Sequence, residues 1–136
     1  MDNWILTSFL ALLIYGLWGF FPKLAVSYIS PQSALVYETL GAMLIGFLAL
    51  FLVDFRPDVQ PKGILFAILT GCAGMLGTLF YFAAASRGRI SVVVALTAVY
   101  PVVTIILAWV VLREPATVKQ IAGMAFALVA IVLLST

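Results

Sequence analysis

Five long apolar runs, each about as long as a membrane-spanning helix, constrain this chain more than any other feature. They are separated by short turns, and they cover residues 4–28, 32–53, 63–86, 91–112 and 118–134. A helix needs about 20 consecutive apolar residues to cross the hydrocarbon core of a bilayer. Strands of a membrane barrel would instead alternate apolar and polar positions. The pattern therefore predicts an all-α membrane fold, a bundle of five transmembrane helices forming a single domain over residues 1–136.

The composition identifies lipid as the solvent of this fold. Hydrophobic residues make up 65% of the chain and charged residues 9%, whereas soluble domains have about 45–50% and about 25%. So few charges cannot cover a water-facing surface, which excludes a soluble domain. The first run lacks a basic segment before it and a cleavage site after it, so we expect a retained span rather than a signal peptide.

The reactive side chains of catalysis are scarce in this sequence. There is no histidine, Cys72 is the single cysteine, and the net charge is +2. No phosphate-binding loop and no serine with a nearby base can be recognised. The sequence therefore predicts no enzyme, no metal or other cofactor, and no nucleic-acid partner.

Two opposite charges, Lys23 and Glu38, lie within the first two apolar runs. Between them, Ser30 and Pro31 predict the start of a helix, as its N-cap and its first residue. Both charges then lie at similar depth on neighbouring antiparallel helices, roughly 10 Å from the turn. Two interpretations stay open: a structural clamp between spans one and two, or a charge that contacts cargo or exchanges a proton.

Prolines interrupt two of the predicted spans and predict a helix kink in each, at Pro22 and at Pro101. Kinked helices lined by hydroxyls recur at transporter binding sites. Core packing of the aromatic residues and backbone hydrogen bonding by the hydroxyls are the competing explanations. The candidate substrate-binding or coupling residues are Lys23, Glu38, Tyr15, Trp18, Thr97, Tyr100 and Thr104.

Small residues predict where helices approach one another closely, because glycine lets two backbones come together in a membrane. We expect these contacts within the bundle rather than at a ligand site. The helix-packing candidates are Gly71, Gly74, Gly77 and Gly123. Capping residues predict two further helix starts: Ser91 as N-cap of span four, and Thr117 with Gln120 as a capping box for span five.

The distribution of cations sets the membrane orientation only weakly. The N-terminal side of the membrane would carry Arg56, Lys62, Arg113 and Lys119. The opposite side would carry Arg87 and Arg89, with Lys23 if it is counted. This bias slightly favours a cytoplasmic N-terminus but permits insertion in both orientations. Copies inserted both ways could form an antiparallel homodimer, which recreates an inverted repeat from one chain.

Several motifs occur together in this chain. The longest is AVYPVVTIILAWVVLREPATVKQIAGMAFALVAIVLL (98–134), with Tyr100-Pro101, Thr104, Glu114, Thr117, Gln120 and Gly123. The others are Trp18-Gly19 followed by Lys23, Ser30-Pro31, and Tyr81-Phe82 with Ala84-Ala85. With these motifs the chain resembles a single EamA-type repeat of the drug/metabolite transporter superfamily.

The resemblance implies a small-solute transporter that works by alternating access. The usual members of the family carry two inverted repeats, ten spans in all, so this chain would be one half. Its partners would be the lipid bilayer, a small-molecule substrate, and a second half in an antiparallel homodimer or a heterodimer. The implied location is the plasma membrane, which in bacteria is the inner membrane.

One position departs from the family's pattern. Many members have an arginine seven residues after the proline that opens span two, and this chain has Glu38 there. The change inverts the local charge and weakens any inference of an anionic substrate. The small size and glycine-rich faces support a second hypothesis, a non-transporting membrane subunit that assembles with or regulates another transporter half.

Overall fold

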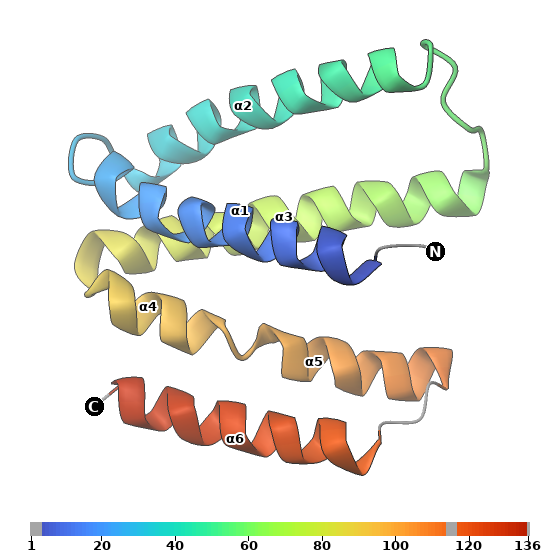
Figure 1. Cartoon of the computed structure of the whole chain (residues 1–136). Helices are drawn as coiled ribbons and strands as arrows, with labels where there is room; N and C mark the ends of the chain where they lie inside the picture. The colour runs from blue at the N-terminus through green and yellow to red at the C-terminus, as the bar shows by residue number, and fades with distance from the viewer. Residues whose placement is uncertain (1–3, 114–116, 136) are drawn as a thin grey trace. The chain divides into compact units, whose positions relative to one another are not determined.

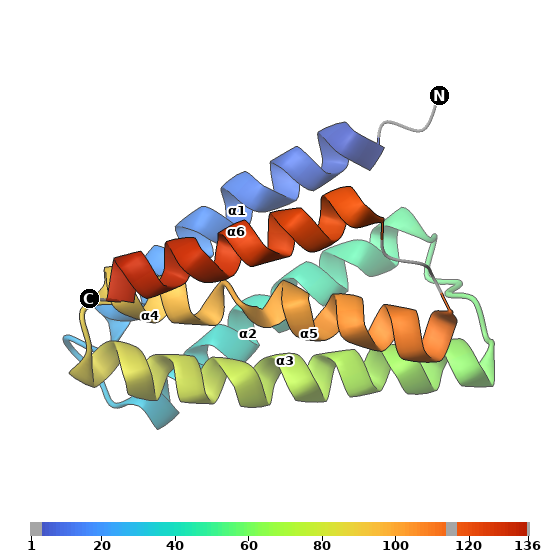
Figure 2. The same ribbon diagram turned by 90° about the horizontal axis from the view of Figure 1, so that it is seen from below.

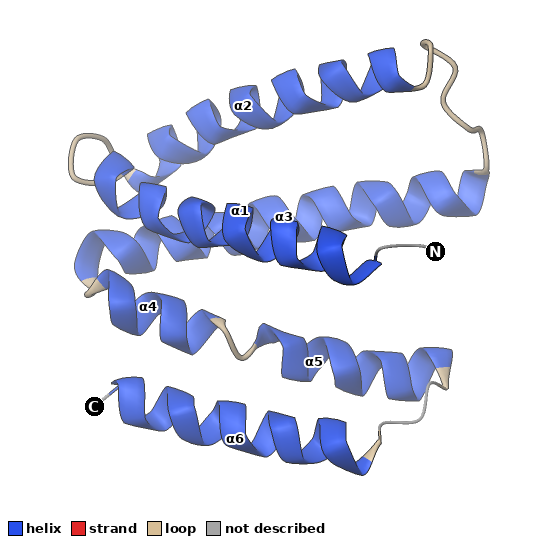
Figure 3. Cartoon of the chain, viewed as in Figure 1, coloured by secondary structure: helices blue, strands red, loops and turns tan. Residues whose placement is uncertain are grey.

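The computed structural model describes residues 4–113 and 117–135, so Glu114 lies outside the described residues. Within these ranges all regular structure is helical (Figure 3). The helices are α1 (Trp4–Ala25), α2 (Pro31–Leu52), α3 (Pro61–Arg87), α4 (Ile90–Thr97), α5 (Tyr100–Leu107), the π-helical turn η1 (Ala108–Leu112) and α6 (Val118–Ser135). The all-α prediction is confirmed.

The lengths of the helices fit a multi-pass membrane protein. Four stretches are long and apolar enough to cross a bilayer: α1, α2, α3 and the interrupted stretch Ile90–Leu112. The fifth, in α6, is apolar but shorter, at Val118–Leu133. The five predicted runs thus correspond to five helical stretches, with bounds that differ by at most a few residues.

The chain forms two compact units, Met1–Arg87 and Gly88–Thr136. We describe each by itself. In the first unit, α1 and α3 run in the same direction, and α2, which connects them along the chain, runs in the opposite direction (Figure 1). Figures 1 and 2 show that the three helices converge where α1 ends, α2 begins and α3 ends. In the second unit, α6 contacts α4 and runs back along the interrupted span.

Local capping explains where two of the helices start. The Ser33 amide donates to the Ser30 hydroxyl at 3.2 Å, and Pro31 occupies the first turn of α2, as predicted. At α6, the Thr117 amide donates to the Gln120 side chain at 2.8 Å and the Gln120 amide to the Thr117 hydroxyl at 3.3 Å. This reciprocal pair is the predicted capping box.

The prediction that Ser91 caps span four was wrong. An N-cap residue has extended backbone geometry, and here the residue with that geometry is Arg89, with φ −71° and ψ 128°. Helix α4 then begins at Ile90, so Ser91 is already helical. The side chain of Arg89 makes no capping hydrogen bond.

Span four is interrupted immediately before Pro101. Helix α4 ends at Thr97 and α5 begins at Tyr100, leaving Ala98 and Val99 between them. Proline has no N–H to donate, and its ring clashes with the carbonyl four residues earlier, here that of Thr97, the last residue of α4. Helix α1, by contrast, continues through Pro22 as one element.

The glycines expected to pack tightly make no close approach in the described chain. A Cβ atom added at Gly71, Gly74, Gly77 or Gly123 would meet no heavy atom within 4 Å. Polar contacts to α3 come at other positions, such as the bond from the Thr39 hydroxyl to the Met75 sulfur at 3.5 Å. Close contact at these glycines stays a prediction for an assembled state.

Candidate functional site

A pocket of about 290 Å³ lies in the first unit, at the end where its three helices converge. Its lining comes from α1, the following turn, α2 and α3: Trp18, Phe21, Pro22, Ala25, Ile29, Ala34, Tyr37, Glu38 and Phe82. Ligand pockets of proteins usually span about 300–1,000 Å³. The pocket is therefore at the small end of this range and suits a small solute.

Helical spacing explains how two elements present their side chains to this pocket. On α1, Phe21, Pro22 and Ala25 follow Trp18 by three, four and seven residues, so all four share one face. On α2, the lining residues come from the first turns after the Ser30 cap, and Glu38 is the deepest of them in sequence. The spacing of these residues along the chain thus places them on the helix face that lines the pocket, and the Ser30 cap determines where α2 begins.

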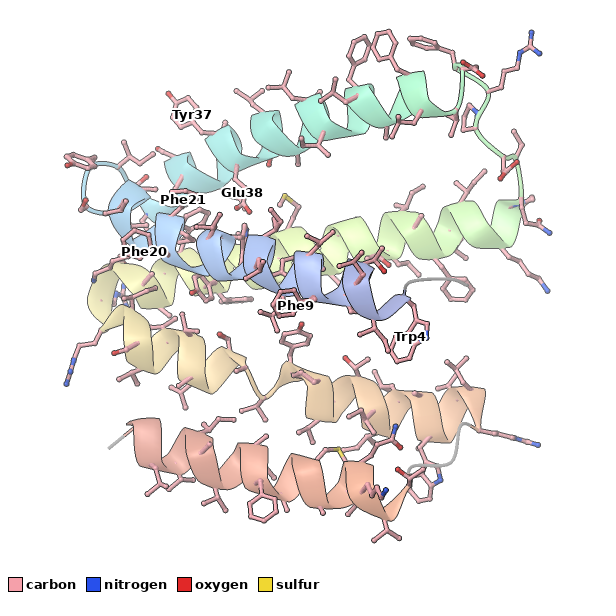
Figure 4. All side chains as sticks on the ribbon, viewed as in Figure 1. Trp4, Phe9, Phe20, Phe21, Tyr37 and Glu38 are labelled. Carbon is pink, nitrogen blue, oxygen red and sulfur yellow. The ribbon has the colours of Figure 1, made fainter. Side chains whose placement is uncertain are left out.

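Glu38 carries the carboxylate of this pocket, and its two oxygens have different surroundings. Oε1 accepts a hydrogen bond from the Trp18 indole nitrogen at 2.8 Å. Oε2 is buried and has no hydrogen-bond partner among the residues that the structure describes. Figure 4 shows Glu38 on the side of α2 that faces α1. An unsatisfied buried acceptor costs about 1–3 kcal/mol, and more when it is charged.

Lys23 contacts the C-terminal end of α3. Its ammonium donates to the carbonyl of Ala85 at 2.8 Å, in the last turn of α3, where the helix dipole favours a cation. Lys23 is half-buried and is not among the residues that line the pocket. The structure shows two links here: Trp18 with Glu38, and Lys23 with Ala85.

Tyr81 strengthens the attachment of α1 to α3. Its buried hydroxyl donates to the carbonyl of Gly19 at 2.7 Å, next to the Trp18 carbonyl that Pro22 cannot serve. The rings of Trp18 and Tyr81 lie 5.2 Å apart at 36°. One face of α1, including Gly19 and Lys23, thus packs on α3.

The remaining candidates on the second unit make contacts within their own span. The Thr97 hydroxyl donates to the carbonyl of Val93 at 2.9 Å, and the Thr104 hydroxyl to that of Tyr100 at 3.3 Å. Both are bonds to the preceding turn of the same helix, and neither reaches the Thr97 carbonyl that Pro101 leaves without its helical donor. The side chain of Tyr100 is exposed.

Of the predicted site residues, the structure brings Trp18, Pro22 and Glu38 together at the pocket, while Tyr15 is exposed and outside the lining. Sequence reasoning missed the other lining residues. Phe21 and Ala25 could have been found from their helical spacing to Trp18. Phe82 could not, because its place depends on how α3 packs against α1 and α2. Among the described residues, no cluster of histidine, cysteine or acidic side chains could hold a metal ion.

Comparison with known proteins gives two matches. The model of a family described as the EamA-like transporter family matches residues 2–136. An uncharacterized protein of Methanocaldococcus jannaschii is 26% identical over 137 residues, which cover 99% of this chain and 98% of that protein. No solved structure matches.

Proposed function

The chain belongs to the EamA-like transporter family, and from this premise we propose that it carries a small solute across the membrane by alternating access. Its apolar helices and its family make it an integral, multi-pass membrane protein. Members of this family are transporters rather than enzymes. The substrate class, the transport mechanism and the assembly are the parts that we propose.

The observation that supports this function best is the pocket at Glu38. It combines a size suited to small solutes with an apolar lining and a carboxylate whose Oε2 lacks a partner among the described residues. Ionisable residues within membrane spans are costly and mark substrate or ion pathways. We assign Glu38 as the group that contacts the solute or exchanges a proton during transport, with Trp18 as its neighbour.

Assembly with a second half is the next part of the proposal. At most 11% of the residues in the apolar stretch of each candidate span are buried by the rest of the chain. These faces meet lipid or another helix bundle. We propose an antiparallel homodimer, or a heterodimer with a related half, that completes a ten-helix inverted repeat in the plasma membrane, the inner membrane in bacteria.

Transport by reconstituted protein tests the function. Purified wild-type chain in proteoliposomes is offered labelled amino acids, nucleotide sugars and cationic and neutral drugs. We expect uptake of at least one class, and at least about tenfold slower uptake by Glu38→Gln, which corresponds to about 1.4 kcal/mol of lost stabilisation. Asp58→Asn, which removes the same charge from an exposed loop residue, is the matched control.

Each result has a definite meaning. Normal insertion with impaired uptake by Glu38→Gln supports a functional carboxylate. Wild-type uptake by that variant shows that Glu38 serves only structure, as does failure of the variant to accumulate. No binding and no uptake of any offered solute by the wild type contradicts the transporter proposal.

The extensive apolar exposure also favours a second candidate, a non-transporting subunit that assembles with or regulates another transporter half. A helix bundle that buries so little of itself is suited to lie against another membrane protein. Affinity purification from native membranes would then recover a stoichiometric, unrelated transporter subunit. Isolation of an active homodimer without such a subunit contradicts this alternative.

A further inference from the structure

The unpartnered oxygen of Glu38 indicates what the pocket lacks. An ionised carboxylate offers about four acceptor sites on two oxygens, and the structure shows one donor, the Trp18 indole on Oε1. Oε2 is buried without a partner among the described residues. A donor that also carries positive charge would satisfy this oxygen most strongly, because charge-assisted hydrogen bonds are about twice as strong as neutral ones.

The walls of the pocket favour the same kind of ligand. Four aromatic side chains from three helices contribute to its lining: Trp18, Phe21, Tyr37 and Phe82. Of these, Phe82 is buried, while Phe21 and Tyr37 are largely exposed. The negative faces of aromatic rings attract organic cations, and such cages recognise quaternary ammonium groups. Glu38 adds a carboxyl group to this surface.

The cation on this part of α1 is Lys23, which has a contact on α3. Lys23 is not among the lining residues, and its ammonium donates to the Ala85 carbonyl at 2.8 Å. The residues that line the pocket thus include one carboxylate and no cationic side chain. One carboxylate among hydrocarbon walls is also a poor shell for a hard cation such as calcium, which takes about 6–8 oxygen ligands.

We propose that this pocket binds a small organic cation, with its ammonium group on Glu38 and its apolar body among the aromatic rings. The inference rests on the proposed function, because it names the substrate class for the same site. Binding draws the carboxylate onto the ammonium, so the environment of the Trp18 indole changes when the ligand enters.

Trp18 provides a direct readout that does not require transport. Replacing the other two tryptophans, as Trp4→Phe and Trp109→Phe, leaves Trp18 as the sole indole of the full chain. The protein in lipid nanodiscs is titrated with choline and with 3,3-dimethyl-1-butanol, the uncharged carbon isostere of choline. We expect saturable change of Trp18 fluorescence with choline, and at least tenfold weaker binding of the isostere.

Two variants distinguish the effect of the pocket carboxylate from the effect of the overall charge of the protein. Glu38→Gln keeps the shape and a carbonyl acceptor for the indole, and we expect it to weaken choline binding at least tenfold. Asp58→Asn removes one negative charge from the loop and should leave binding unchanged. If Glu38→Gln does not fold, the comparison of choline with its isostere on the parent protein still decides the matter.

The outcomes distinguish this inference from the proposed function. Equal binding of choline and the isostere, no binding of either, or unchanged choline binding by Glu38→Gln overturns the cation site. Uptake of an anionic or neutral solute by the same preparation would then leave the transporter proposal standing. Choline binding without uptake of any cation supports the site and counts against transport.

Discussion

At the scale of single residues, Trp18 connects the pocket to the packing of the first unit. Its ring lies 5.2 Å from that of Tyr81, and its indole nitrogen donates to Glu38. The sequence marks Trp18, Lys23 and Glu38 as unusual because polar groups are costly within a membrane span. It could not give their partners, because a hydrogen bond between helices depends on the rotation of each helix about its axis. The Ala85 carbonyl in particular carries no signal in the sequence.

Replacing the indole while keeping an aromatic ring isolates the bond to Glu38. Trp18→Phe keeps a ring beside Tyr81 but removes the donor, leaving Oε1 of Glu38 without that bond. Side-chain hydrogen bonds between membrane helices contribute about 0.6–1.7 kcal/mol, so we expect a lower thermal unfolding temperature in detergent. Trp109→Phe is the control, because Trp109 is exposed on the second unit. Equal stability of the two variants would contradict the link between α1 and α2.

At the scale of elements, helix starts with local signals were predicted and contacts between helices were not. Ser30 and the pair Thr117 with Gln120 cap their helices as expected, since both ends of each bond lie within three residues. The position of Pro101 predicted a disturbance but not its extent, a gap at Ala98 and Val99. The depth of Lys23 and Glu38 marked both residues but indicated neither of the partners that the structure shows.

The attachment of α1 to the end of α3 is testable at Lys23. Lys23→Met keeps most of the apolar stem but removes the ammonium that donates to Ala85. We expect a loss of about 1–2 kcal/mol in unfolding free energy, seen as a lower midpoint in denaturant. Lys119→Met, at an exposed position in the first turn of α6, should change the midpoint little. If Lys23→Met shifts the midpoint no more than Lys119→Met does, the bond from Lys23 to Ala85 does not stabilise the fold.

The interruption of span four makes a separate prediction. Pro101→Ala restores an N–H and relieves the ring clash, an effect worth up to about 3 kcal/mol within a helix. We expect slower amide hydrogen exchange at Ala98 and Val99, together with slower solute uptake. Pro57→Ala, in the loop between α2 and α3, should change neither quantity. Slower exchange with unchanged uptake would show that transport does not require the break.

At the scale of the whole molecule, the fold class followed from the lengths of the apolar runs, since lipid admits few alternatives to helices. The division into two compact units and the pocket did not follow, because both depend on packing between distant segments. The glycine spacing of α3 predicted close contact, yet the space beside Gly71, Gly74 and Gly77 is open in the single chain. The glycine spacing identifies a helix face that suits close contact, but it does not identify the helix that packs against that face.

Membrane orientation tests the proposed antiparallel assembly. In a Cys72→Ser background, single cysteines are placed as Ser27→Cys in the turn before α2 and as Gln60→Cys in the loop after it. These positions lie at opposite ends of one span. Because the cation bias is small, we expect an impermeant maleimide to label each from both sides of the membrane. Labelling of each position from one side alone would exclude an antiparallel homodimer and leave the heterodimer.

The gap before Pro101 has a consequence for the bilayer itself. Proline offers no hydrogen to the carbonyl of Thr97, and the hydroxyl of Thr97 is a donor to Val93. Hydrocarbon provides no substitute donor, so this oxygen attracts whatever polar molecule can reach it. We therefore expect water to enter the bilayer more readily beside this break than beside the uninterrupted helices. Deuterium oxide contact measured by spin labels along that span should peak at Ala98 and Val99.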